Sequence, residues 1–221
     1  EESSEVLVEF DHPIHGILID AGVSSPQLDE ADRGFSFMQP APLDMRMDNR
    51  LQVTAKDLVN GLSAKELEMV FSKFAQVQRA KTIADAIVRR RATEEIQTTA
   101  DLADIVMRSV GGFRGKLHPA TKVFLALRIA VNDELGNLER ALPRLFNLLA
   151  DSGRLVVISF HEGEDRIVKH QFKAFVQDQK GISLMKTPMI PSDDEVQNNS
   201  RSRSAKLRAI EKSEQSEKGE K

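Results

Sequence analysis

The sequence predicts an α/β protein in which one β-sheet is interrupted by an inserted all-helical domain. Residues 15–20 and 152–161 form short apolar runs with β-branched side chains, which are typical of buried strands. Roughly 100 residues with mostly helical patterns separate these runs, far more than a normal crossover connection requires. An inserted helical domain is the simplest explanation of this spacing.

The composition fits such an ordinary globular protein. The 221 residues are 40% hydrophobic and 29% charged, with a net charge of -3, which is enough apolar material for a core. The absence of cysteine excludes disulfides, thiolate metal sites and a cysteine nucleophile. No apolar run approaches the ~20 residues that span a bilayer. The predicted domains are residues 1–48 (first part of the sheet domain), 49–130 (helical insertion), 131–212 (second part) and 213–221 (disordered tail).

The first elements follow from an apolar run, turn residues and capping signals. The first strand ends on Asp20, and residues 21–50 contain the prolines and glycines of irregular structure. Helices are predicted to begin after Thr54 and after Ser63, where Glu66 completes a capping-box pattern.

Apolar stripes at helical spacing continue through the middle of the chain. They predict helices at residues 79–91, 98–110 and 118–149. Thr98 or Thr99 is the expected cap of the second stretch, and a glycine-rich loop at 111–116 follows it. The third stretch is long enough for two helices, with a break near residues 132–136.

The carboxy-terminal part returns to strand patterns. Residues 152–161 have the continuous apolar run of a central parallel strand covered on both faces. An amphipathic helix is predicted at 164–176, and two further strands at 181–188 and 204–212.

Two stretches are basic although the net charge is slightly negative. Residues 73–91 hold six lysines and arginines against the single acid Asp85, and residues 201–208 are basic again. Such patches bind polyanions, but they are also typical of solvated helix faces. The residues alone leave both interpretations open.

Polar and small residues follow the first strand where an open parallel sheet binds its ligands. Asp20 ends this strand and His161 ends the later one. Asp20 either caps a following helix or accepts hydrogen bonds from a ligand. Gly22 lets the backbone approach a ligand closely. The polar residues Ser24, Ser25 and Gln27 favour the ligand interpretation.

The motifs around this strand resemble a known family. Residues 18–48, LIDAGVSSPQLDEADRGFSFMQPAPLDMRMD, strongly resemble the bacterial 16S rRNA (cytosine-N4)-methyltransferase family (RsmH/MraW). AKTIADAIV, HPATKVFLALRIAVNDEL, GRLVVISFH, EDRIVK and SRSRSAKLR match in family order, so the resemblance covers residues 15–212. It implies a Rossmann-like, S-adenosyl-L-methionine-dependent methyltransferase sheet with an inserted helical domain. The implied reaction is methylation of the N4 amino group of a specific cytidine in small-subunit rRNA.

The resemblance also implies roles for individual residues. The implied cofactor-binding residues are Asp20, Gly22 and Gln27, and the implied catalytic residues are Asp20, Ser24, His161 and Asn132. The implied RNA-binding residues are Asp44, Arg46, Arg89, Arg90, Arg91 and Arg128. Asp48, Glu134 and Ser159 lie in the same family segments, and Arg114 and Lys116 add charge to the glycine-rich loop. No metal is expected. The expected partner is small-subunit rRNA or the 30S subunit, not a membrane, and a homodimer is left open. The expected location is the bacterial cytoplasm, or an organelle in a eukaryotic source.

The chain also departs from the family pattern. The family begins with a strand and a glycine-rich loop that cradles the cofactor, and neither precedes residue 15. With no initiator Met, the sequence is expected to be a fragment, a processed chain or a shortened form. Smaller departures are Ala75-Gln76-Val77 for Gly-Glu-Glu, Glu162-Gly163 for Ser-Leu and Ala21 for Leu. The alternative function is therefore a truncated, non-catalytic RNA- or ribosome-binding homologue, and a small-molecule methyltransferase is the weakest hypothesis.

Overall fold

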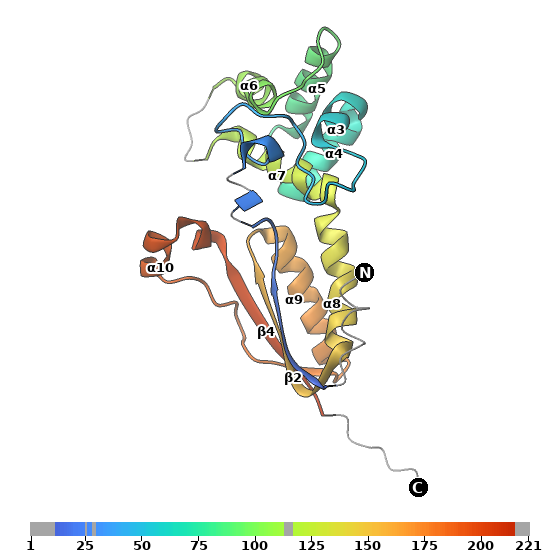
Figure 1. Cartoon of the computed structure of the whole chain (residues 1–221), viewed down its shortest axis with the longest axis vertical. Coiled ribbons are helices and arrows are strands. Elements are labelled where there is room, and N and C mark those ends of the chain that lie inside the picture. The colour runs from blue at the N-terminus through green and yellow to red at the C-terminus, as the bar shows by residue number, and fades with distance from the viewer. Residues whose placement is uncertain (1–11, 25, 28–29, 113–116, 215–221) are drawn as a thin grey trace. The chain divides into compact units, whose positions relative to one another are not determined.

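A computed structural model of the chain describes residues 12–24, 26–27, 30–112 and 117–214 (Figure 1). The chain forms two compact units, which we describe separately. The sheet unit combines residues 1–22 with 135–221, and the helical unit consists of residues 23–134. An α/β chain with an inserted helical body was predicted, and this architecture is confirmed.

The unit limits fall at different residues from the predicted domain limits. The segment after residue 22 belongs to the helical unit because Phe35, Leu43 and Met45 are buried in the core of that unit. The helical unit also continues to Glu134, at the start of the next helix.

The sheet unit is built on a four-stranded mixed sheet. Its strands are β1 (Ile14–Asp20), β2 (Leu149–Ser159), β3 (Gly181–Ser183) and β4 (Lys206–Lys212). Their order is β1-β2-β4-β3, and β2 pairs in parallel with β1 and antiparallel with β4. The predicted central position of β2 is confirmed, but only one of its two neighbours is parallel.

Two helices, α8 (Glu134–Leu148) and α9 (Glu162–Gln177), cover one face of this sheet (Figure 1). Apolar side chains of both helices share one buried cluster with Leu155 and Val157 of β2. Phe146 of α8 and Phe175 of α9 stack with ring centroids 4.0 Å apart. This cluster is the core of the sheet unit.

The opposite face of the sheet is largely uncovered within the described residues. Side chains alternate between faces along a strand, so Leu18 and Val156, which are register partners, point away from α8 and α9. Leu18 is 66% exposed and Ile182 of β3 is 58% exposed. The sequence predicted a buried first strand and a second strand covered on both faces. Among the described residues, the structure instead places β1 at a sheet edge, with one covered face.

The helical unit contains α3 (Ala55–Gly61), α4 (Ala64–Ala75), α5 (Ala80–Arg91), α6 (Thr99–Ser109), α7 (Pro119–Asn132) and the short 3₁₀ helix η1 (Ala31–Arg33). Thr54, Ser63 and Thr98 form capping boxes at the starts of α3, α4 and α6, which confirms the predicted caps and selects Thr98 over Thr99. Asp133, in the left-handed conformation, separates α7 from α8, as the predicted break requires.

The remaining carboxy-terminal elements are short. They are β3, α10 (Asp193–Asn198) and the 3₁₀ helix η2 (Ser200–Ser204). The strand predicted at 181–188 is therefore only three residues long, and Met189 makes an isolated bridge to Leu207 of β4. Part of the predicted tail, residues 215–221, and the loop at 113–116 lie outside the described residues. No helix in the described part of the chain is long and apolar enough to span a bilayer.

Candidate functional site

The carboxyl ends of β1 and β2 lie side by side in the sheet unit. Asp20 is the register partner of Ile158, and the Ala21 N–H donates to the Ile158 carbonyl at 3.0 Å. The residues that follow the two strands, 20–22 and 159–161, therefore leave the sheet at one edge. In parallel arrangements this edge is where ligands bind.

Asp20 is an exposed acid at this edge. Its carboxylate has no hydrogen-bond partner in the described part of the chain, and it caps no described helix. Two residues later Gly22 has a φ of 96°, a left-handed conformation that favours glycine. The structure thus places an accessible carboxylate beside a backbone turn without a side chain.

His161 lies at the end of β2 and caps α9. Its Nδ1 accepts a long hydrogen bond from the Glu164 N–H at 3.4 Å, while the Glu164 carboxylate accepts from the Phe160 N–H at 2.8 Å and the His161 N–H at 3.2 Å. His161 Nε2 lies 3.3 Å from Glu164 Oε1 but is buried without a hydrogen-bond partner among the described residues. A Cβ at Gly163 would lie 3.1 Å from Nδ1, so glycine there lets the imidazole pack against the helix start.

A cluster of charged side chains joins α9 to β4 beside the end of β2. Asp165 of α9 accepts from Arg208 Nε at 2.7 Å and from Lys206 Nζ at 3.3 Å, both on β4. Burial raises the pKa of Asp165, but the hydrogen bonds and charges of Arg208 and Lys206 outweigh burial and lower the pKa overall. Ser159, which is buried, donates to the Lys206 carbonyl at 3.3 Å. These contacts join the end of β2 and the start of β4 to α9.

Ser24 and Gln27 interact with each other in the helical unit. Gln27 Oε1 accepts from the Ser24 N–H at 3.0 Å and from Ser24 Oγ at 3.2 Å. Ser25 lies outside the described residues. This exposed turn keeps the Gln27 amide oxygen occupied and leaves its NH₂ group as a donor.

Arg46 is held inside the loop that follows Leu43. Its guanidinium donates to both carboxylate oxygens of Asp44, at 2.7 and 2.8 Å, and to the Leu51 carbonyl at 2.7 Å. The hydrogen bond from Arg46 is the main reason why the pKa of Asp44 lies below its ordinary value. Arg46, predicted to bind RNA, therefore has its side chain engaged within the loop.

Asn132 at the end of α7 also binds this loop. Its amide NH₂ donates to the Met45 carbonyl at 2.7 Å and the Arg128 carbonyl at 2.8 Å, and its Oδ1 accepts from the Met47 N–H at 2.7 Å. Asn132 is only 8% exposed. The catalytic role predicted for Asn132 remains a prediction, and the geometry assigns its amide to the backbone of the loop.

Arg128 is similarly engaged. It forms a two-point ion pair with Glu134, at 2.8 and 2.9 Å, with both side chains largely buried. A bidentate pair of this kind orients both side chains. The predicted contact of Arg128 with RNA would therefore have to compete with Glu134.

Comparison with known proteins identifies the family. The sequence profile of the MraW methylase family matches residues 3–213. The chain belongs to the MraW methylase family. It is 49% identical over 199 residues to a protein of Coprothermobacter proteolyticus named ribosomal RNA small subunit methyltransferase H, covering 90% of this chain and 66% of that protein. Proteins of the same name from Solibacter usitatus (51% identity, 90% and 68% covered) and Elusimicrobium minutum (50% identity, 89% and 67% covered) are equally similar.

The chain spans about two thirds of the length of these curated relatives. Within the aligned part, identity near one half extends over both units. The resemblance read from the motifs is therefore confirmed at the level of the family.

The three arginines at the end of α5 differ in their surroundings. Arg90 pairs with Glu94 at 2.6 Å, and Arg91 donates to the Val59 carbonyl at 2.6 Å. Arg89 is exposed and has no partner within the described residues. Of the three predicted RNA contacts in this MraW-family chain, Arg89 is the most available. Arg114 and Lys116 lie outside the described residues.

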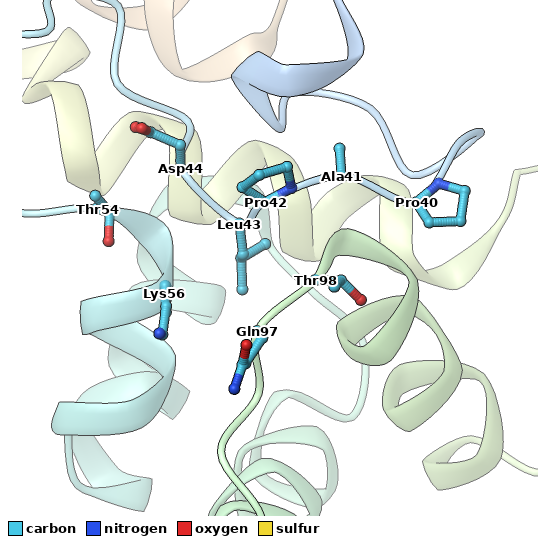
Figure 2. A pocket seen from close by; sticks show the side chains of 9 residues that line it. All are labelled: Pro40, Ala41, Pro42, Leu43, Asp44, Thr54, Lys56, Gln97 and Thr98. Carbon is cyan, nitrogen blue, oxygen red and sulfur yellow. The ribbon is translucent and has the colours of Figure 1, made fainter.

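The helical unit also contains an open pocket of about 460 Å³. Figure 2 shows the segment 40–44 along one side, with Thr54, Lys56, Gln97 and Thr98 on the other. Lys56 pairs with Glu95 at 3.2 Å. The pocket has an apolar wall and a polar rim, and the loop that holds Asp44 and Arg46 forms part of that wall.

Sequence reasoning missed supporting residues in each unit. Arg33 donates to the carbonyls of Arg46 at 2.7 Å and Met47 at 3.0 Å, and Asp165 anchors β4 to α9. The alternation of Lys206 and Arg208 along β4 placed both cations on one face and could have indicated a carboxylate partner. No local signal in the sequence connects Arg33 with residues 46–47.

Proposed function

We propose that this chain provides the methyl-transfer site of an enzyme that methylates the N4 amino group of a cytidine in small-subunit ribosomal RNA. The observation that carries the proposal is the identity near one half, over about nine tenths of the chain, to proteins named ribosomal RNA small subunit methyltransferase H. A relationship this close over most of the chain makes the same chemistry the simplest expectation. The methyl donor in this proposal is S-adenosyl-L-methionine.

The end of β1 fits one side of such a cofactor site. The exposed Asp20 carboxylate can accept hydrogen bonds from a hydroxyl or an amino group, and the turn at Gly22 has no Cβ to obstruct a ligand. When bound, the cofactor supplies an electrophilic methyl group on a sulfonium. We assign Asp20 and Gly22 to its recognition. The cofactor contact of Gln27, which the resemblance implies, stays a prediction.

The cytosine amino group is a weak nucleophile because its lone pair is delocalised into the ring. An acceptor that holds one amino N–H orients this lone pair, and positioning of this kind provides much of the rate. Asp20 is the accessible acceptor at the strand end, whereas His161 Nε2 is buried. The target base must also leave its stack to reach the site.

Titration calorimetry with S-adenosyl-L-methionine tests the cofactor assignment. We expect the folded chain to bind and Asp20→Asn to weaken binding by roughly tenfold or more, the effect of losing a charge-assisted hydrogen bond. Asp193→Asn is the control, because Asp193 is an exposed acid of the sheet unit on α10. Equal affinities for wild type and Asp20→Asn would remove Asp20 from the cofactor site.

Methyl transfer to a small-subunit rRNA transcript then tests the reaction. Incorporation of label from the methyl donor into cytidine is expected, and it should be lost in Asp20→Asn. RNA binding by the folded chain without any transfer would instead support a non-catalytic RNA-binding homologue.

A further inference from the structure

The loop of residues 44–51 contains the same short pattern twice. Asp44 and Arg46 are separated by one residue, as are Asp48 and Arg50. Each arginine forms an ion pair with the aspartate two positions before it, at 2.7 Å for the first pair and 2.8 Å for the second. The two pairs are thus locally equivalent, and the structure separates them by their surroundings.

The first pair points into the loop. The side chains of Asp44 and Arg46 are 26% and 23% exposed, and Arg46 also donates to the Leu51 carbonyl at 2.7 Å. A guanidinium with several planar donors is suited to hold a carboxylate and a carbonyl together. The first pair therefore ties the beginning of the loop to its end.

Two side chains from distant positions complete this support. Asn132 binds the Met45 carbonyl and the Met47 N–H, both at 2.7 Å. Arg33 donates to the carbonyls of Arg46 and Met47, and its own carbonyl accepts from the Met45 N–H at 3.0 Å. The backbone between residues 45 and 47 is thus bound from η1 and from α7.

Met45 adopts a strained conformation under these constraints. It is completely buried and has a φ of 64°, which side-chain-bearing residues rarely adopt. Strain of this kind persists only where the surrounding contacts determine the conformation, and it concentrates in functional segments. Among the six described non-glycine residues with a positive φ, Met45 combines this conformation with complete burial.

The second pair points outward. The side chains of Asp48 and Arg50 are 43% and 74% exposed, and Asn49 between them is exposed. The inner half of the loop is held in place, and the outer half presents Arg50 at the surface, oriented by its ion pair with Asp48. A preorganised cation of this kind binds a phosphate with little loss of conformational entropy.

We propose that the two pairs divide the work of an RNA-binding loop: Arg46 and Asn132 are positioning residues, and Arg50 contacts an RNA phosphate. This inference rests on the proposed function, because it takes ribosomal RNA as the ligand. It reassigns Arg46 from contacting RNA to holding the residue that does.

The test measures affinity for a small-subunit rRNA transcript over a range of salt concentrations. The proteins are the full chain and its Arg46→Gln, Arg46→Lys, Arg50→Gln and Arg50→Lys variants. Arg50→Gln should lower the slope of log affinity against log salt by about one, because one phosphate contact is lost. Arg50→Lys should keep the slope, since lysine also neutralises a phosphate.

At position 46 the effects on affinity and on the salt slope should differ from those at position 50. Arg46→Gln should weaken binding roughly fivefold or more with an unchanged salt slope, and Arg46→Lys should fail to rescue it because lysine lacks the planar donors. Arg108→Gln is the matched control, since Arg108 pairs with Asp104 on the surface of α6 and supports no loop. Circular dichroism establishes folding, and Arg46→Lys carries the test if Arg46→Gln is unfolded.

The outcomes separate this inference from the proposed function. A wild-type chain without affinity for the transcript contradicts both. A wild-type chain that binds, with a reduced slope in Arg46→Gln and rescue by lysine at 46, contradicts only the division between the pairs. Unchanged binding in Arg50→Gln also contradicts only that division.

Discussion

The helical unit and the sheet unit differ in how far the described residues enclose their apolar side chains. In the helical unit, Leu67 and Phe71 are fully buried in a core to which five helices and the segment 35–45 contribute. In the sheet unit, α8 and α9 cover one face, while Leu18 on the other face is 66% exposed. Within the described residues, the core of the helical unit is enclosed by its own helices, whereas the sheet is covered by helices on one face only.

This difference suggests how the two units contribute to function. The closed core of the helical unit supports a strained, preorganised loop, because Met45 is held by contacts to Asn132 and Arg33. Among the described residues, the sheet unit leaves the Asp20 carboxylate without a partner at the carboxyl end of β1, the end at which parallel sheets commonly bind ligands.

The same substitution in both units should have very different effects on stability. Leu67→Ala removes a fully buried side chain and should lower the free energy of unfolding by about 2–5 kcal/mol. Leu18→Ala, on the uncovered face, should change it by less than about 0.5 kcal/mol. Urea unfolding followed by circular dichroism measures both. A cost for Leu18→Ala close to that of Leu67→Ala would show that this face is covered in solution.

The charged pairs of the two units should also differ. Asp165 is 11% exposed and faces both Arg208 and Lys206, whereas Asp44 is 26% exposed and faces Arg46. Replacing Asp165 by Asn leaves two cations poorly compensated and should cost roughly 2–4 kcal/mol. Asp44→Asn should cost only about 1 kcal/mol, because its pair is more solvated.

The pH dependence of folding stability tests the same two carboxylates, Asp44 and Asp165. Both carboxyls have a pKa in the folded chain below the value in the unfolded chain, which is about 4. Each therefore stabilises the fold above pH 4, and this contribution is lost as the pH falls through the folded pKa. Unfolding measured from pH 6 down to pH 3 should show a shallower loss of stability in Asp165→Asn than in wild type. Parallel curves for the two proteins would contradict the role of Asp165.

Local signals in the sequence were sufficient for most elements but not for the site. The caps at Thr54, Ser63 and Thr98 follow from side chains three residues apart, and the break at Asp133 follows from helix length, so each was predictable. The clamp of Asn132 on Met45 joins positions 87 residues apart, which no periodicity encodes. The exposure of Leu18 was mispredicted for a related reason, since an apolar strand looks the same at the edge of a sheet as at its centre.

The smallest expected effects concern the helix caps of the two units. In the helical unit Ser63 Oγ accepts from the Glu66 N–H at 3.3 Å, and the Glu66 carboxylate accepts from the Ser63 N–H at 2.8 Å. Ser63→Ala should cost about 1 kcal/mol and leave cofactor affinity unchanged. In the sheet unit the cap is His161, whose Nδ1 makes only a 3.4 Å contact with the Glu164 N–H.

The His161→Asn variant separates the helix-capping role of His161 from a catalytic role, because asparagine is a good cap but has no imidazole. We expect His161→Asn to keep the free energy of unfolding within about 0.5 kcal/mol and to keep most of its affinity for S-adenosyl-L-methionine, since Nε2 is buried. Unfolding, titration calorimetry and methyl transfer are measured on the same preparation. A stable variant that binds the cofactor but transfers no methyl group would establish the catalytic role predicted for His161 from the sequence. Retained transfer would assign the imidazole to capping and leave Asp20 as the acceptor at the strand end.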